Sequence, residues 1–380
     1  MASPQRSMCG STGCKGGPSS AVSSVMIEGL AQFVVPLFQT RIVFGQGKVN
    51  TLTEELDRLG VARVAFICTP LGARRYSRLI ASLGDRCATV FAEAVPHSPV
   101  KVSEAAAKAV MQSGADATVC VGGGSTIGLG KFVAVTEGRP QIAVPTTLSG
   151  SELTPIYGFK SGHEKRAGVS PDAVPRVAIY DPTVAASLPA RETAQSGMNS
   201  LAHSVEAFYM PNANRLSDVL ATEGVRALFD GLPGCVERPS DLSARATAMY
   251  GGLVGGLLVA MVGIGLHHKI CHVLGGRFGL PHGVLNGIIL PQAIAFNAPA
   301  MPEAIDRLAS AIGDDDPSAA CFRLAKRLGL PLTLREVGVA EADLAPAVED
   351  IVAAQVPNPR PTDRAAVTDL LRRAWSGEPP

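Results

Sequence analysis

Short apolar runs in the first half of the chain constrain the fold more than any other feature. The clearest of them are Arg63–Cys68 (RVAFIC), Ala117–Val121 (ATVCV), Pro140–Val144 (PQIAV) and Arg176–Tyr180 (RVAIY), with a weaker run at Ala88–Phe91. Helical patterns at residues 51–59, 70–84 and 102–113, and another from Ser125 onward, separate them. Buried strands that alternate with helices indicate a parallel sheet with right-handed crossovers. The sequence therefore predicts an α/β domain.

The strand signal stops after Asp181-Pro182, and the rest of the chain has helical patterns joined by short Pro/Gly loops. A chain of 380 residues is long enough for two domains, each with its own core. We therefore expect a dinucleotide-binding α/β domain at 25–185 and an all-α substrate and catalytic domain at 186–380. Residues 1–24 are rich in Ser, Gly and Pro and are expected to be a disordered tail. The apolar segment 33–44 is expected to be an edge strand or hairpin.

Charge and composition exclude several classes of partner. The net charge is +1 without a basic block, so binding to nucleic acid or to an anionic membrane has no electrostatic support. The eight cysteines form no CxxC pair, which is typical of reduced thiols in a cytoplasmic enzyme. No apolar segment of a secretory signal is visible in residues 1–24. Residues 246–266 are uncharged, but their six glycines favour a buried, closely packed helix over a membrane span.

A glycine-rich loop follows the strand predicted at 117–121. Residues 121–131 read VGGGSTIGLGK and lie between a predicted strand and a predicted helix. The backbone of Gly122, Gly123 and Gly124 could approach a pyrophosphate, and the hydroxyls of Ser125 and Thr126 could cap the helix or bind a phosphate oxygen. The loop matches neither GxGxxG after a first strand nor GxxxxGK[ST]. A packing turn without a ligand is the alternative.

A second loop, PTTLSGSELT at 145–154, follows another predicted strand. Ligands of open α/β sheets bind at the carboxyl ends of the strands, so two such loops favour a dinucleotide. We expect Thr146 and Thr147 to border the nicotinamide, and Leu148 to belong to the same cofactor site. Thr69 follows the first strand of the nucleotide unit, where an Asp would repel the 2′-phosphate of NADP. Without that repulsion, the sequence predicts that both NADH and NADPH are used.

Residues 267–282, HHKICHVLGGRFGLPH, contain four of the seven histidines. His268 and His272 are four residues apart and share one face of a helix, which Gly275-Gly276 could end; Pro281 precedes His282. Asn199 and His203 have the same spacing in GMNSLAH, so two helices could form one polar pocket. Histidines suggest zinc or iron. Asn199 argues against a metal, because an amide brings no charge; histidines satisfied within a core are the remaining alternative.

Several motifs resemble the iron-containing alcohol dehydrogenase superfamily, and in particular its maleylacetate reductase branch. GGGSTIGLGK, PTTLSGSELTP, GMNSLAHSVEA and HHKICHVLGGRFGLPH occur here in the same order as in that superfamily. Gly128 and Asn199 stand where its metal-dependent members have Asp. One segment differs from the branch: GVLN follows His282, where maleylacetate reductases more often have AETH or AQTH. HGV-x-N is typical of the metal-dependent members.

The resemblance implies a homodimer with a cleft active site. It implies that NADH or NADPH reduces the conjugated C=C of maleylacetate, or of a similar oxo-enoic acid, to 3-oxoadipate or its analogue without a required metal. Such a reaction belongs to the degradation of aromatic compounds. We expect His268 and His282 to act at the ketone oxygen, with His203 as a lesser partner and His272 as a proton relay near the nicotinamide. Lys165, between two predicted strand-end loops, could bind a substrate carboxylate, as could Arg166 or Arg277.

Three other functions remain open. A metal-dependent alcohol dehydrogenase or carbonyl reductase, acting on a small acid or aldehyde, would hold iron or zinc through His203, His268, His282 and Asn199. A sugar-phosphate cyclase resembling dehydroquinate synthase would share the two-domain plan and use NAD. A non-catalytic binding protein is the alternative from another class. Retention of both the glycine loop and the histidine cluster favours an enzyme.

Overall fold

The protein's structure, a computed structural model, describes residue 35 and residues 39–96, 98–161 and 164–380, and leaves out the side chains of 160–166. The tail expected at 1–24 lies outside the described residues, as does most of the apolar segment before Thr40.

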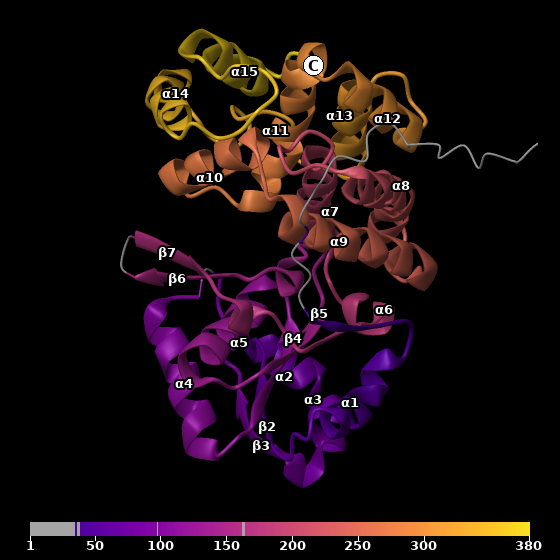
Figure 1. Ribbon diagram of the computed structural model, residues 1–380, viewed down its shortest axis with the longest axis vertical. Coiled ribbons are helices and arrows are strands. Elements are labelled where there is room, and N and C mark those ends of the chain that lie inside the picture. The colour runs from indigo at the N-terminus through magenta and orange to yellow at the C-terminus, as the bar shows by residue number, and fades with distance from the viewer. Residues whose placement is uncertain (1–34, 36–38, 97, 162–163) are drawn as a thin grey trace, which may run out of the picture. The chain divides into compact units, whose positions relative to one another are not determined.

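A six-stranded parallel sheet forms the centre of the first half, as the sequence predicted (Figure 1). Its strand order is β1-β8-β5-β4-β2-β3. The strands are β1 (Arg41–Phe44), β2 (Val64–Ile67), β3 (Cys87–Phe91), β4 (Ala117–Gly122), β5 (Gln141–Pro145) and β8 (Val177–Tyr180). Strands β2, β4, β5 and β8 are buried on both faces, which explains their continuous apolar sequences. β1 lies at an edge, where the sequence predicted an edge strand.

Helices cover both faces of this sheet. Successive side chains of a strand point to opposite faces, so Phe66 packs with α1 (Leu52–Arg58) and α3 (Ser77–Ser82), and Ile67 packs with α4 (Val100–Ser113) and α5 (Gly124–Glu137). The helix predicted at 70–84 is broken at Tyr76 into α2 (Pro70–Arg75) and α3. Short 3₁₀ turns lie at η1 (Lys48–Thr51), η2 (Gly84–Arg86), η3 (Ser151–Leu153) and η4 (Pro171–Ala173).

A two-stranded antiparallel hairpin, which the sequence analysis missed, follows β5. It consists of β6 (Ile156–Ser161) and β7 (Glu164–Val169), with Lys160 opposite Lys165 in the register. Lys165 and Arg166 therefore lie on a strand within the connection from β5 to β8. Their side chains are outside the described part of the protein. Glycines and charges in both strands hide the alternation of apolar and polar residues that would have indicated a hairpin.

From residue 182 onward the described chain is helical, as expected. The helices are α6 (Pro182–Ala185), α7 (Ala190–Glu206), α8 (Arg215–Glu237), α9 (Leu242–Val262), α10 (Leu266–Phe278), α11 (His282–Asn297), α12 (Pro302–Ile312), α13 (Pro317–Arg327), α14 (Leu344–Ala353) and α15 (Arg364–Ser376), with 3₁₀ turns η5 (Ala298–Ala300) and η6 (Glu341–Asp343). α10 continues through Gly275 and Gly276 and ends at Gly279, whose φ of 66° is left-handed. The glycine pair therefore does not end the helix, contrary to expectation.

Helix α9 contains most of the uncharged stretch at 246–266. Within the described residues it alone is long and apolar enough to cross a membrane, but 67% of its most apolar window is buried. Its glycines explain the packing. A Cβ on Gly256 would lie 2.7 Å from the Cα of Gly150, and one on Gly252 would lie 3.0 Å from the carbonyl oxygen of Leu148. The backbone of α9 thus lies directly against the loop after β5.

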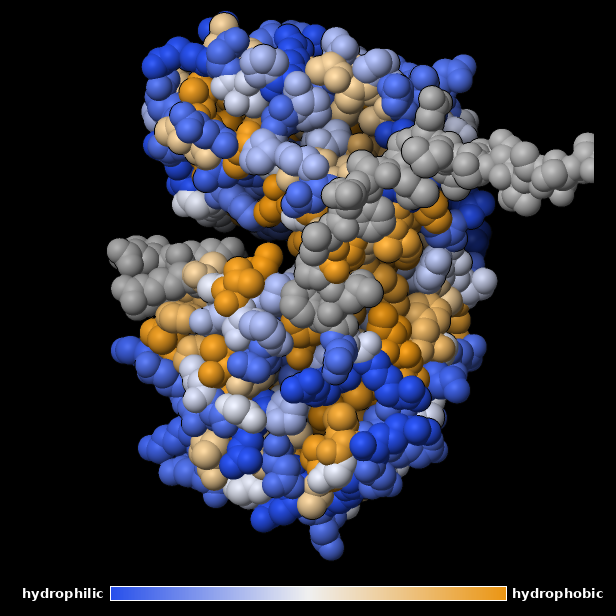
Figure 2. Space-filling view, viewed as in Figure 1, coloured by the Kyte–Doolittle hydropathy of each residue, from blue (hydrophilic) through white to orange (hydrophobic). Residues whose placement is uncertain are grey.

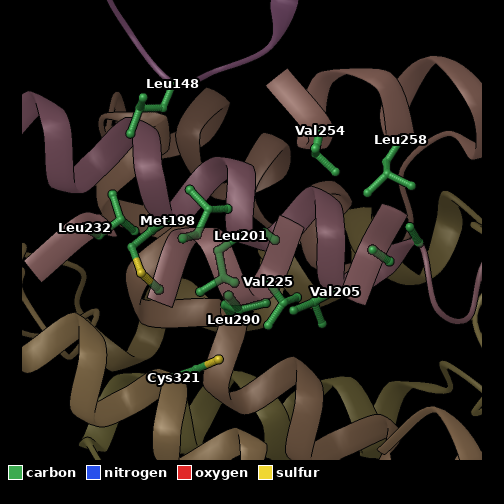
Figure 3. Packing of buried hydrophobic residues seen from close by; sticks show 14 of the residues in the cluster. Leu148, Met198, Leu201, Val205, Val225, Leu232, Val254, Leu258, Leu290 and Cys321 are labelled. Atoms are coloured by element: carbon green, nitrogen blue, oxygen red, sulfur yellow. The ribbon is translucent and has the colours of Figure 1, made fainter. Parts of the chain in front are cut away.

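One apolar cluster joins segments on both sides of residue 185. Leu148 and Tyr180, from the α/β half, pack with Met198 and Leu201 of α7 and with residues of α8 and α9. Figure 3 shows Leu148 pointing from its loop toward this cluster. The two halves expected from the sequence therefore share a core, which holds the loop after β5 next to α7.

Candidate functional site

The glycine loop and the loop after β5 lie side by side. Gly122 is in register with Pro145, and its carbonyl accepts a hydrogen bond from the N–H of Thr146 at 3.0 Å. A Cβ on Gly123 would lie 2.7 Å from Cγ2 of Thr147. The structure thus brings together the two strand-end segments that the sequence analysis assigned to a dinucleotide.

This pair of loops suits a phosphate group. Gly124 is the exposed first residue of α5, and a Cβ there would contact only Ser151 and Ser149 hydroxyls, at 3.9 and 4.0 Å. The Oγ1 of Thr126 and the Oγ of Ser151 are buried and have no hydrogen-bond partner among the described residues. Such hydroxyls, beside an open helix N-terminus, fit the pyrophosphate of a dinucleotide.

The local start of α5 differs from the sequence prediction. Gly123 is the N-cap residue, and no side chain of the described chain caps the helix there. Ser125 and Thr126 therefore lie inside the first turn and do not cap it. The carbonyl of Ser125 accepts a hydrogen bond from Ser98 at 3.3 Å.

Two further residues expected at the cofactor have clear local roles. Thr69, at the end of β2, caps α2, because its Oγ1 accepts a hydrogen bond from the N–H of Gly72 at 3.0 Å. The side chain of Leu148 belongs to the apolar cluster and is 2% exposed, so only its backbone is available to border a ligand. Its carbonyl accepts a hydrogen bond from the Oγ of Ser200 on α7 at 2.6 Å.

Lys131, the last residue of the glycine motif, is buried and anchors the hairpin. Its Nζ donates hydrogen bonds to the carbonyls of Thr154 and Ile156, each at 2.7 Å. Burial lowers the pKa of Lys131 to about 7, and the nearby Glu152 opposes this shift. Because Ile156 begins β6, Lys131 connects α5 to the base of the hairpin that carries Lys165.

The four predicted histidines form one cluster built from three helices. The ring of His203 on α7 stacks on that of His268 on α10, with centroids 4.6 Å apart. The ring of His282, at the start of α11, lies 5.8 Å from His268 and 5.2 Å from His272. His203 and His268 are buried, His282 is half-buried and His272 is exposed. The spacing of four residues therefore predicted this grouping correctly.

Two further members of this cluster, Glu206 and His267, were not predicted from the sequence. The Oε2 of Glu206 lies 2.6 Å from Nδ1 of His268. The Nδ1 of His267 lies 3.3 Å from the same nitrogen, and its Nε2 lies 3.6 Å from the Sγ of Cys271. Glu206 follows His203 by three residues on α7, and this helical spacing is the signal that could have revealed it.

Electrostatics keep the buried rings neutral. Burial lowers the pKa of His203, His267 and His268 well below the ordinary value, and neighbouring histidines lower it further. Burial raises the pKa of Glu206. The shifts arise because water, which would stabilise the protonated ring, is excluded from His203 and His268.

The expected ligand set of Asn199, His203, His268 and His282 fits a catalytic iron or zinc poorly; the carboxylate of the cluster, Glu206, groups instead with His267 and His268. Asn199 lies near the cluster on α7, but its Oδ1 accepts a hydrogen bond from Nδ2 of Asn286 at 3.0 Å. Neither this amide nor the rings of His203, His268 and His282 carry a negative charge to compensate a divalent cation. Asn286 belongs to the GVLN segment in which this chain differs from the maleylacetate reductase pattern, so that difference contributes a direct partner for Asn199.

Arg277, which was expected as a candidate partner of a substrate carboxylate, forms an ion pair within the protein. Its Nε lies 2.8 Å from Oδ2 of Asp350 in a largely exposed ion pair between α10 and α14.

Comparisons with known proteins show the family to which this chain belongs. The family model described as iron-containing alcohol dehydrogenase matches residues 39–182, and the model described as Fe-containing alcohol dehydrogenase family, C-terminal, matches residues 193–375. The maleylacetate reductase of Pseudomonas sp. (strain P51) is 41% identical over 340 residues, which cover 90% of this chain and 97% of that protein.

Solved structures with the same fold include that of maleylacetate reductase from Agrobacterium tumefaciens. It has a TM-score of 0.89 and 39% identity and covers 92% of this chain and 100% of that one. Sulfoacetaldehyde reductase from Bifidobacterium kashiwanohense, solved in complex with NAD+, has a TM-score of 0.85 and covers 92% of this chain and 100% of that one. At 23% identity, its similarity concerns the fold alone.

Proposed function

Since the chain belongs to the maleylacetate reductase branch of the iron-containing alcohol dehydrogenase family, we propose that this oxidoreductase uses NADH or NADPH to reduce the conjugated C=C of maleylacetate, or of a similar oxo-enoic acid, without a required metal. The product would be 3-oxoadipate or its analogue. The observation that carries the proposal is the histidine cluster with the neutral Asn199–Asn286 pair beside it.

The cofactor would occupy the two adjoining strand-end loops. The backbone from Gly122 to Gly124 and the unpartnered hydroxyls of Thr126 and Ser151 would hold the pyrophosphate. Thr146 and Thr147 would border the nicotinamide, in the cleft that we expect between the two halves. When bound, the reduced nicotinamide would supply a hydride to the alkene carbon β to the ketone.

The protein's task is then to stabilise charge and deliver a proton. Addition of hydride leaves the electron pair of the broken C=C on the enolate, whose negative charge lies largely on the ketone oxygen. His268 and His282 would hydrogen-bond this oxygen, and His203 would support them through the stacking of its ring on that of His268. The exposed His272, whose ring stacks on that of His282, would relay a proton from water to the α carbon. Lys165 would bind one substrate carboxylate.

A metal-dependent alcohol dehydrogenase or carbonyl reductase, acting on a small acid or aldehyde, is the second candidate. The observation that favours it is Asn286, because the HGV-x-N segment resembles the metal-dependent members of the family. In that case His203, His268, His282 and Asn199 would hold the ion. The charge balance of this ligand set argues against it, as described above.

Asn199→Asp tests the two candidates against each other. An aspartate keeps the oxygen that accepts from Asn286 and adds the negative charge of a metal ligand. We expect the wild type to reduce maleylacetate after exhaustive chelation. We expect the variant to bind more Fe or Zn and to lose kcat, because its charge lies beside a dianionic substrate. Metal content and turnover would be measured for both proteins, with and without chelator.

The opposite result is equally clear. Stoichiometric metal in the wild type, with activity lost on chelation and regained with Fe or Zn, would contradict the metal-free reaction and support the alcohol dehydrogenase.

The similarity to maleylacetate reductases and the five buried free thiols also lead us to propose the cytoplasm as the compartment. We propose a small oxo-acid, rather than nucleic acid or a membrane, as the partner.

A further inference from the structure

Glu206 is a buried acid that the proposed reaction does not use. It lies on α7 three residues after His203, and it is 0% exposed. Burial of a carboxylate is costly unless hydrogen bonds compensate the loss of water. Its contacts should therefore reveal why the fold keeps it.

Those contacts connect two helices of the histidine cluster. The Oε2 of Glu206 accepts a hydrogen bond from the N–H of Gly265 at 3.0 Å and lies 2.6 Å from Nδ1 of His268. Gly265 is the N-cap residue of α10, where a negative charge is favourable. A Cβ on Gly265 would lie 3.0 Å from Oε1 of Glu206, so a glycine here allows the carboxylate to approach the backbone closely. One carboxylate thus fixes both the start of α10 and the ring of His268.

The short contact determines which nitrogen of His268 faces the site. Burial raises the pKa of Glu206, but the N–H of Gly265 and the neighbouring His267 oppose this shift and favour the ionised form. An ionised carboxylate only accepts hydrogen bonds, so the hydrogen of the neutral ring would lie on Nδ1, toward Glu206. The Nε2 of His268 is buried and has no hydrogen-bond partner in the part of the chain that the structure describes. The neighbouring rings of His203 and His282 lie 4.6 and 5.8 Å away. A ring held in this way can gain a proton only on Nε2.

We propose that Glu206 is a positioning residue: it holds His268 in the tautomer with hydrogen on Nδ1, so that Nε2 faces the reacting group. This rests on the proposed function, in which His268 acts at the ketone oxygen. Without Glu206 the ring could rotate, or carry its hydrogen on Nε2 before substrate binds. Because Nε2 of the neutral tautomer carries no hydrogen, His268 would take up a proton from water on Nε2 when the anionic substrate binds and would then donate it in a hydrogen bond to the ketone oxygen. The carboxylate of Glu206 would compensate the resulting positive charge on the ring.

The test combines ring spectroscopy with kinetics on the full chain. Nitrogen-15 NMR of labelled histidines distinguishes the two tautomers, and the signals of His268 are assigned by their loss in His268→Asn. We expect hydrogen on Nδ1 in the wild type and a shift toward the other tautomer in Glu206→Gln, whose amide can donate as well as accept. We expect kcat of that variant to fall about 10- to 100-fold, with KM little changed. Glu192→Gln, at an exposed position on the same helix, should change neither quantity.

Two outcomes would overturn the proposal: hydrogen on Nε2 of His268 in the wild type, or wild-type kcat in a folded Glu206→Gln. If that variant does not fold, the wild-type ring spectrum still decides, because it needs no variant of Glu206. The spectrum also needs no substrate. A wild type that shows the Nδ1 tautomer but does not reduce maleylacetate would therefore contradict the proposed function and leave the positioning role standing.

Discussion

Thr69 is the residue at which the choice between NADH and NADPH can be altered with least disturbance. Asp is a strong N-cap, so Thr69→Asp should keep the hydrogen bond that starts α2. Its charge would repel the 2′-phosphate of NADPH. We expect kcat/KM to fall for NADPH relative to NADH by about tenfold, which corresponds to about 1.4 kcal/mol. Steady-state kinetics with NADPH and with NADH measure this ratio of kcat/KM values.

Thr69→Asn is the matched control for this change. It is also a good N-cap but carries no charge. It should retain the use of both cofactors that we predict for the wild type. A wild type with roughly a thousandfold preference for NADH, or an aspartate variant with unchanged selectivity, would argue against Thr69 as the residue near the adenosine ribose.

Single residues also show how far the sequence could predict this site. The pairs Asn199/His203 and His268/His272 were found because a helix places residues four apart on one face. The spacing of three residues from His203 could have revealed Glu206 on the same helix, but its hydrogen-bond partner could not be recognised from local sequence. Its partner Gly265 lies 59 positions further along the chain, and only the packing of α10 on α7 brings the two together. The lowered histidine pKa values also depend on burial, which local sequence does not determine.

At the scale of elements, the N-terminus of α5 is a direct test of the cofactor site. Gly124 has open space around it, so Gly124→Val should fold normally. Its side chain would occupy the place where backbone approaches phosphate. We expect the dissociation constant for NADH to rise at least tenfold, by calorimetry or fluorescence titration. Thr136→Val, exposed near the other end of the helix, is the control. Unchanged NADH binding by a folded Gly124→Val would remove the assignment.

The contact between α9 and the loop after β5 leads to a prediction about stability. A Cβ at Gly256 would meet three backbone atoms of Gly150 at 2.6 to 3.1 Å, so the backbone must move. We expect Gly256→Ala to lower the free energy of unfolding by about 1–3 kcal/mol. It should also raise KM for NADH, because the displaced loop includes Thr146 and Thr147.

A control at Gly276 isolates the effect of the contact. It lies within α10, and a Cβ added there would have no neighbouring atom of the described chain within 4 Å. Gly276→Ala should therefore stabilise the protein by about 0.5–1 kcal/mol, as alanine usually does in a helix. Urea denaturation measures both variants. Equal stability changes for the two would show that the approach of α9 to Gly150 is not tight.

Elements also differ in how well sequence predicts them. The buried parallel strands were found because both faces are apolar, and the helices of the second half because of their periodicity and Pro/Gly boundaries. The hairpin β6–β7 was missed because its strands lack that apolar continuity, and the break at Tyr76 was missed because a helical pattern spans it. The start of α5 was predicted one residue late, at Ser125 and not at Gly124, because no side chain of the described residues caps the helix and marks its beginning.

For the whole molecule, the buried histidines predict a loss of stability in mild acid. His203, His267 and His268 have lowered pKa values when folded, whereas unfolded histidines titrate near 6.5. Below about pH 6.5 the unfolded chain therefore binds more protons, and stability falls as pH decreases. Each histidine contributes up to about 1.4 kcal/mol per pH unit.

Two buried carboxyls act in the opposite direction. Burial raises the pKa of Glu206 and Glu152, so these two groups release their protons at higher pH in the folded protein than in the unfolded chain. Because three histidines outweigh two carboxyls, we expect the urea concentration at the unfolding midpoint to decrease when the pH is lowered from 6.5 to 5.5. The fall should be smaller in His267→Asn. A urea midpoint that increases when the pH is lowered over this range would indicate that the rings are protonated in the folded state.

The homodimer that we propose places a second copy at the edge strand β1. Ile42 is 39% and Phe44 36% exposed on this strand, and an edge strand offers unpaired backbone groups. Figure 2 shows further apolar side chains among charged ones on one face of the molecule. We expect sedimentation at micromolar concentration to show a dimer, and Ile42→Lys to weaken it.

Val90→Lys provides the comparison for the dimer. Val90 is 40% exposed on β3, the strand at the opposite edge of the same sheet. This variant should remain dimeric. A wild type that sediments only as a monomer would remove the proposal, and equal weakening by both lysines would place the contact elsewhere.

The glycines of α9 also limit how this sequence can evolve. Because the methyl-sized spaces at Gly252 and Gly256 are filled by the backbone of another segment, no change of side chain elsewhere can make room for a larger residue there. A library randomised at these two positions and selected for folded, active protein should return almost only glycine, with alanine as a rare survivor. The same library at Gly276 should return many residue types. A stretch that hydropathy alone would assign to a lipid bilayer is thus constrained by a neighbouring loop of its own chain.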